Sequence, residues 1–207
     1  MKKVKFMSAV ATMCLAGVAQ AGLVDFEDVA SGTNLVNQSV VSQGFNAAHT
    51  GSFALVFGNS GQGATDWSGN GTHRWLSFNT SSLTLTQVGG AAFSAFGFDG
   101  GESWIQPGSP HFWATQIQVV GNYAAGGSTT QTFDLDLIKN TLTGMQAFGL
   151  NSSFVGLNSL VFTGIGGNPE FSVDNVAVGA VPEPATYALM LAALGLMGFV
   201  ARRRRAA

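Results

Sequence analysis

Charged side chains are scarce in this sequence. Asp, Glu, Lys and Arg make up 10% of its 207 residues, where a soluble domain averages about 25%. Between Gly22 and Val181 the only basic residues are Arg74 and Lys139, and the same stretch holds ten acidic residues, a formal charge of −8. Nucleic acid is therefore excluded as a partner, because neutralising its phosphates requires Lys and Arg.

Cysteine is almost absent as well. The single cysteine, Cys14, lies in a segment that we expect to be removed, so the mature protein has no disulfide. A hydrophobic core must then hold the fold, with or without a metal ion. Gly (28 residues) and Phe (16 residues) are frequent, and long helical periodicity is lacking in the middle of the chain. This composition favours strands and loops over helices.

Sequence signatures of common hydrolases and of nucleotide-binding loops are also missing. The chain contains no H-E-x-x-H, no G-x-S-x-G and no Gly-rich P-loop pattern. His49, His73 and His111 stand in separate segments without the spacing of metal ligands. Asp134 and Asp136 share one face of an expected strand, which places them side by side and not across a glycosidic bond. We predict no catalytic residue and no enzymatic activity, and keep a glycan-active hydrolase as the weakest alternative.

The N-terminus has the pattern of a secretory signal peptide over residues 1–21. An apolar stretch follows a positively charged start that is formed by Lys2, Lys3 and Lys5. Ala19-Gln20-Ala21 then matches the small-x-small site of signal peptidase. Cleavage there makes Gly22 the first residue of the mature protein. The alternative is a membrane anchor that stays, but the apolar run is short for a spanning helix.

The C-terminus carries a second membrane-directed segment. Residues 185–201 are uncharged and apolar, at the lower end of the length range for a spanning helix. Four basic residues follow at once: Arg202, Arg203, Arg204 and Arg205. Because arginines stay on the cytoplasmic side, the preceding body is expected outside the inner membrane. Val181-Pro182-Glu183-Pro184 stands before the helix, and its two prolines favour a stiff, extended and accessible segment.

This order of VPEP, apolar helix and arginine cluster resembles the PEP-CTERM sorting signal of Gram-negative bacteria. The similarity covers residues 181–207, with Pro182, Glu183 and Pro184 on the motif and Arg202 to Arg205 on its basic stop. It implies that an exosortase cuts near the Pro-Glu-Pro and releases the body or transfers it to the cell surface. Many bacteria with this system make exopolysaccharide and biofilm. The resemblance predicts a destination and leaves the task of residues 22–180 open.

The body, residues 22–180, consists of short apolar or alternating runs between Gly, Asn and Ser turns. In Gln131–Ile138, for example, Phe133, Leu135 and Leu137 alternate with polar residues, which is typical of a half-buried strand. Ten such strands are expected: Leu23–Phe26, Ser52–Phe57, Arg74–Phe78, Ser82–Thr86, Ala91–Phe98, Phe112–Val120, Gln131–Ile138, Gln146–Leu150, Ser159–Thr163 and Phe171–Val178. The pattern predicts an all-β fold, a two-sheet β-sandwich of the jelly-roll kind.

The first and last runs of the body weakly resemble jelly-roll domains of the carbohydrate-binding kind. The body opens with Val24-Asp25-Phe26-Glu27 and closes with Phe171–Val176, which reads FSVDNV. The resemblance implies that the first and last strands pair and that structural calcium binds near them. Asp25, Glu27 and Asp174 would supply the carboxylate oxygens that calcium prefers. The alternative is a solvated strand face with an Asp that caps a turn.

Tryptophan supplies the best hint of a ligand. Trp67 and Trp104 lie in segments rich in Gly, Asn, Ser and Pro, where an exposed indole can stack on a sugar ring. Packing in the core is the alternative for both. We therefore expect a non-catalytic surface or matrix protein that contacts exopolysaccharide through polar loops and these tryptophans. A purely structural surface component without a specific ligand is the alternative.

Overall fold

The computed structural model describes residues 21–35, 38–51, 53–58, 69–78, 80–102, 113–138, 143–167, 169–181, 191–197 and 202. Residues 21–179 form one compact unit. Its strands are β1 (Ala21–Val24), β2 (Thr33–Asn34), β3 (Ser39–Ser42), β4 (Phe45–Thr50), β5 (Phe53–Phe57), β6 (Arg74–Phe78), β7 (Ser82–Gln87), β8 (Phe93–Glu102), β9 (Gln116–Tyr123), β10 (Ser128–Asp134), β11 (Gln146–Gly149), β12 (Leu157–Ile165) and β13 (Phe171–Ala180).

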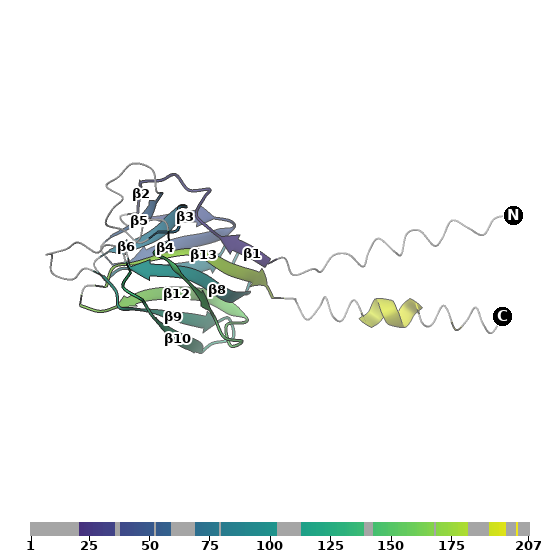
Figure 1. The fold of residues 1–207 in the computed structure, drawn as a ribbon. Coiled ribbons are helices and arrows are strands. Elements are labelled where there is room, and N and C mark those ends of the chain that lie inside the picture. The colour runs from purple at the N-terminus through teal and green to yellow at the C-terminus, as the bar shows by residue number, and fades with distance from the viewer. Residues whose placement is uncertain are drawn as a thin grey trace. The chain divides into compact units, whose positions relative to one another are not determined.

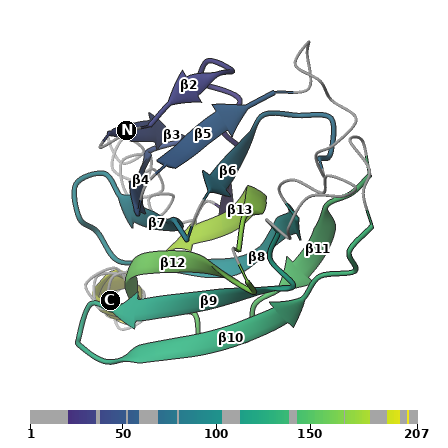
Figure 2. The same cartoon turned by 90° about the vertical axis from the view of Figure 1, so that its left-hand side faces the viewer.

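The strands form a single curled sheet of antiparallel pairs (Figures 1 and 2). Its main path runs β2-β5-β6-β13-β8-β12-β7-β4-β3, while β1 joins β13, β11 joins β8, and β9 lies between β12 and β10. The all-β prediction is confirmed. The predicted division into two sheets is not seen, because β12 pairs with β7, β8 and β9 and so connects the ladders into one sheet.

The sheet curls around one main core, because alternate residues of most strands face the same interior. Ring contacts join strands that are distant in sequence: Phe45 and Phe93 lie 5.0 Å apart between ring centroids, and so do Phe98 and Phe162. Trp75 is fully buried there. A smaller cluster covers the opposite face of β5 and β6, and its members are Phe53, Leu55, Phe57, Leu76 and Phe78.

The β3–β4 hairpin was not among the expected strands. Its two-residue loop consists of Gln43 with φ 48° and Gly44 with φ 79°. A loop with positive φ at both residues matches the twist of an antiparallel hairpin, and glycine adopts that conformation without strain. The flanking residues are only partly apolar, so the alternating pattern that marked the other strands is weak here.

The expected strand Gln131–Ile138 is wrong at its C-terminal end. β10 begins at Ser128 and ends at Asp134, and Leu137 is 47% exposed, outside the core. Leu137 has φ 59°, and its backbone N–H donates to the carboxylate of the buried Glu102 at 2.6 Å. The chain therefore turns out of the sheet after Leu135, although the alternation of residues continues in the sequence.

The first and last strands pair, as the sequence predicted. The register places Ala21 opposite Gly179, Gly22 opposite Val178, Leu23 opposite Ala177, and Val24 opposite Val176. Figure 1 shows β1 beside the C-terminal half of β13. This pairing brings the start of the body to the point where the last strand ends.

The C-terminal residues that the structure describes are helical at 191–197 and at Arg202. Within the described ranges, no helix has the length and apolar character needed to cross a membrane. The rest of the predicted span 185–201 lies outside those ranges, together with Pro182, Glu183, Pro184 and the last three arginines of the cluster, Arg203 to Arg205.

Candidate functional site: a buried carboxylate on the closing strand

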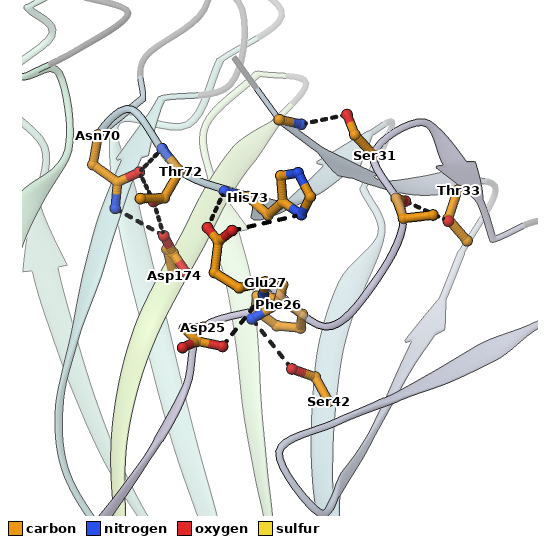
Figure 3. Close-up of polar contacts among 12 residues, drawn as sticks. Asp25, Phe26, Glu27, Ser31, Thr33, Ser42, Asn70, Thr72, His73 and Asp174 are labelled. Atoms are coloured by element: carbon orange, nitrogen blue, oxygen red, sulfur yellow. Dashed lines mark hydrogen bonds and ion pairs between the residues drawn. The ribbon is translucent and has the colours of Figure 1, made fainter. Parts of the chain in front are cut away.

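Asp174 is a fully buried acidic residue in the middle of β13, with 0% of its surface exposed. Its Oδ2 accepts hydrogen bonds from the Asn70 side-chain amide and the Thr72 hydroxyl, both at 2.8 Å. Its Oδ1 accepts the backbone N–H of Asn175 at 2.7 Å. The φ of Asn175, 48°, is left-handed and marks a local irregularity of the strand at this site. Figure 3 shows Asn70 and Thr72 converging on the carboxylate.

These contacts fasten the segment before β6 to the last strand. Thr72 Oγ1 also lies 2.5 Å from Asn70 Oδ1, and Asn70 Oδ1 accepts the backbone N–H of Thr72 at 3.3 Å. Because a hydroxyl has one proton, Thr72 donates either to Asn70 or to Asp174 at a given moment. A protonated Asp174 could donate to Thr72, whose own proton would then point to Asn70.

Two further charged residues surround Asp174. On β8, Asp99 accepts the side-chain amide of Asn175 at 2.8 Å. On β6, Arg74 is 1% exposed and its guanidinium lies 5.7 Å from the centre of the Phe57 ring, within the range of a cation–π contact. Burial lowers the pKa of Arg74 to about 10, against an opposing effect of the Asp174 charge. Arg74 thus remains a cation at neutral pH.

Burial also governs the protonation of Asp174. It raises the pKa of this carboxyl group to about 6, and the nearby charge of Asp99 acts in the same direction. The hydrogen bonds from Asn70, Thr72 and the Asn175 backbone oppose the rise but do not cancel it. A carboxylate that is fully enclosed in this way cannot meet a solute unless the structure opens. Its present role is to hold the Asn70–Thr72 segment against β13.

The other two predicted calcium ligands, Asp25 and Glu27, accept hydrogen bonds from groups of the protein. Glu27 accepts the backbone N–H of His73 at 2.7 Å, and its other oxygen lies 3.9 Å from His73 Nδ1. Asp25 accepts the backbone N–H of Glu27 and the side-chain amide of Gln43, both at 3.3 Å. Figure 3 shows Glu27 close to the segment that also binds Asp174. Glu27, which follows β1, and Asp174 of β13 therefore contact the same segment before β6.

The calcium hypothesis for Asp25, Glu27 and Asp174 stays a prediction. In the part of the chain that the structure describes, no group of three or more His, Cys, Asp or Glu residues is placed to hold a metal ion. The three carboxylates instead accept hydrogen bonds from N–H and O–H donors of the protein. In this arrangement a cation would have to displace those donors before it could bind the carboxylates.

An exposed aromatic ring, Phe96 of β8, lies next to β13. Phe93, Ala95 and Phe98 of β8 belong to the core, whereas Phe96 of the same strand is 52% exposed. A Cβ atom on Gly179 of β13 would lie 2.9 Å from Phe96 Cε2. The ring is thus held against the backbone of β13, at a position where only glycine leaves room for it.

The predicted tryptophan contacts, Trp67 and Trp104, lie outside the described residues. Of the predicted signal-cleavage residues, Ala19 lies outside them too, whereas Ala21 and Gly22 belong to β1. Sequence analysis missed Asn70, Thr72 and Phe96. The amide and the hydroxyl lie in a polar loop without a motif, and Phe96 follows core residues in an apolar run, so no local pattern distinguishes it.

Several solved structures are distantly similar to this chain. A variant of a family 29 carbohydrate-binding module has a TM-score of 0.44 and 9% identity over 80% of this chain and 99% of that chain. A family 29 module from Piromyces equi has a TM-score of 0.40 and 8% identity, covering 79% and 91%. The K2 cleaved adhesin domain of Lys-gingipain has a TM-score of 0.42 and 14% identity, covering 76% and 97%. TM-scores below 0.5 do not establish a common fold.

The C-terminal end gives a firmer result. No curated protein matches the chain. Residues 180–205, however, match the family described as PEP-CTERM protein-sorting motif. This confirms the resemblance that VPEP, the apolar run and the arginines suggested, and it implies an exported surface protein that an exosortase processes. The chain therefore carries a PEP-CTERM sorting motif directly behind the last strand of an all-β body.

Proposed function

We propose that this chain is a non-catalytic cell-surface or extracellular-matrix protein whose body contacts exopolysaccharide. The sorting motif at residues 180–205 is the observation that carries the proposal, because it implies delivery of the body to the cell surface. After signal cleavage the apolar segment 185–201 holds the precursor in the inner membrane. The exosortase then releases or transfers the body. No step in this role requires a reacting side chain.

Phe96 supports glycan contact. A half-exposed aromatic ring presents an apolar face on which a sugar ring can stack. The end of the ring lies close to Gly179 of β13, where a Cβ atom would be 2.9 Å from Phe96 Cε2. This contact restricts the ring, so Phe96 would lose little conformational freedom on binding.

Retention of the purified body, residues 22–180, on the exopolysaccharide of the producing cells tests the proposal. Wild-type protein should be retained, and Phe96→Ala should be retained much less. Val88→Ala is a matched control, because Val88 is also exposed, at 55%, but lies in the turn after β7. A run with a chelator tests the calcium hypothesis. Wild-type protein that elutes without delay in every condition would contradict glycan binding.

The alternative is a structural component without a specific ligand, and it is supported by the edge strand β10, which could pair with another copy of the body. Among the described strands β10 pairs only with β9, and Figure 2 shows it as the outermost strand of its side of the sheet. Charged side chains and proline usually block the pairing of exposed edge strands. The residues of β10 from Ser128 to Phe133 include neither. Association of the purified body that rises with concentration and is lost in Thr130→Lys would favour this alternative.

A further inference from the structure

The expected signal-cleavage site lies in the same β-ladder that ends where the sorting motif begins. Signal cleavage is expected between Ala21 and Gly22, which are the first two residues of β1. Their partners on β13 are Gly179 and Val178. The sorting motif begins at residue 180, directly after this pair. The body therefore starts and ends at neighbouring positions, although 150 or more residues separate them in the chain.

The N-terminal site lies inside the ladder. Both residues of the bond to be cut are paired with β13, and a Cβ atom on Gly22 would lie 3.7 Å from Val178 Cγ2, so the two strands are in close contact. Two residues further on, Val24 is fully buried in the core. A peptidase must bind its substrate as an extended segment in its own active site, and native structure that pairs the segment protects it until it opens.

The ladder ends before the C-terminal site in the sequence. β13 ends at Ala180, and Val181 follows as irregular chain. Pro182 and Pro184 have no backbone N–H, so they cannot continue strand pairing. A cut near the Pro-Glu-Pro therefore needs no opening of the body, in contrast to the cut after Ala21.

We propose that closure of the β1–β13 ladder and cleavage by signal peptidase are mutually exclusive, so that the signal peptide is removed before the body closes. In the reaction water adds across the Ala21–Gly22 bond, which gives a carboxylate on Ala21 and an amino group on Gly22. The freed strand then pairs with β13, while the sorting motif stays available to the exosortase. The inference rests on the proposed export route, with cleavage after Ala21, and not on glycan binding.

A pair of cysteines across the ladder reports closure. Leu23 and Ala177 are opposite each other and not part of the core, and paired residues of antiparallel strands have the Cα separation that a disulfide needs. The full chain with Leu23→Cys and Ala177→Cys, on a Cys14→Ser background, is exported in a Gram-negative cell. Free thiols are blocked at successive times after a labelling pulse. Gels without reductant and the N-terminal mass then give the cross-linked fraction of cut and uncut chains.

Cross-links should be confined to chains that begin at Gly22, and a signal peptidase inhibitor should accumulate precursor without them. Cross-linked precursor that still carries residues 1–21 would overturn the inference. A second pair, Val24→Cys with Val176→Cys, leaves the bond to be cut unchanged and checks for local distortion at the first pair. Absence of a cross-link from both pairs in processed protein would show that the ladder itself is wrong. Leu23→Cys with Asn158→Cys is the control, because β12 does not pair with β1.

The test separates this inference from the proposed function. Chains that are never cut after Ala21 would overturn the export route, and this inference with it. Loss of glycan retention would leave the cross-linking result unchanged, because closure is measured before the body meets any polymer.

Discussion

Asp174 should make the stability of the body depend on pH in an unusual direction. Burial, with the charge of Asp99, raises the pKa of its carboxyl group from 3.8 to about 6. The folded state then holds this proton more tightly than the unfolded state does. The resulting stabilisation is fully present below pH 3.8 and is lost as the pH rises through 6. At about 1.4 kcal/mol per pKa unit, the loss amounts to roughly 3 kcal/mol.

The substitution Asp174→Asn isolates this contribution, because other titrating groups affect both proteins alike. We expect the free energy of unfolding of the variant, relative to wild type, to rise by roughly 2 kcal/mol between pH 4 and pH 7, since titration has already begun at pH 4. Urea unfolding of residues 22–180 at several pH values measures it. A constant difference would show that Asp174 titrates normally. A fall with pH would show that Arg74, and not burial, governs the carboxylate.

Three further substitutions test the neighbouring features. Asn70→Ala removes a donor to the buried carboxylate and should cost about 1–3 kcal/mol at pH 7 in urea unfolding, and less at pH 4; equal costs at both values would contradict the assignment. Gly179→Ala places a Cβ 2.9 Å from Phe96 Cε2, so the ring should swing away at a cost below about 1 kcal/mol, and glycan retention should fall; unchanged retention would argue against this site. Pro182→Ala with Pro184→Ala should leave the body at the inner membrane on cell fractionation, and normal surface delivery would refute the sorting role.

Most of the strands could be predicted from short apolar runs that lie between turn residues. Most expected strands, such as Arg74–Phe78 and Gln146–Leu150, coincide with strands of the structure to within a few residues. Prediction failed where an unusual backbone conformation determines whether a strand or hairpin forms. The Gln43–Gly44 loop forms a hairpin through positive φ at two residues, and the sequence on either side has little apolar alternation.

The candidate site was less predictable, because its contacts are non-local. Asp174 was expected near the first strand, and its strand β13 does pair with β1, over Val176 to Gly179. Its hydrogen-bond donors, however, are 104 and 102 residues away, at Asn70 and Thr72. No spacing in a single sequence indicates which polar loop folds over which strand, so partners of this kind emerge only when the sheet has been assembled.

The burial of Arg74 has a consequence for how this protein is detected. Trypsin cleaves after Lys and Arg, and between Gly22 and Val181 the chain offers only Arg74 and Lys139. Arg74 is 1% exposed in the middle of the sheet, where protease access requires unfolding. Surface shaving of intact cells with trypsin should therefore release few fragments of the body, and those fragments are long. Surveys that depend on short tryptic peptides will undercount it, whereas a protease that cuts at aromatic residues has many sites in a chain with 16 phenylalanines.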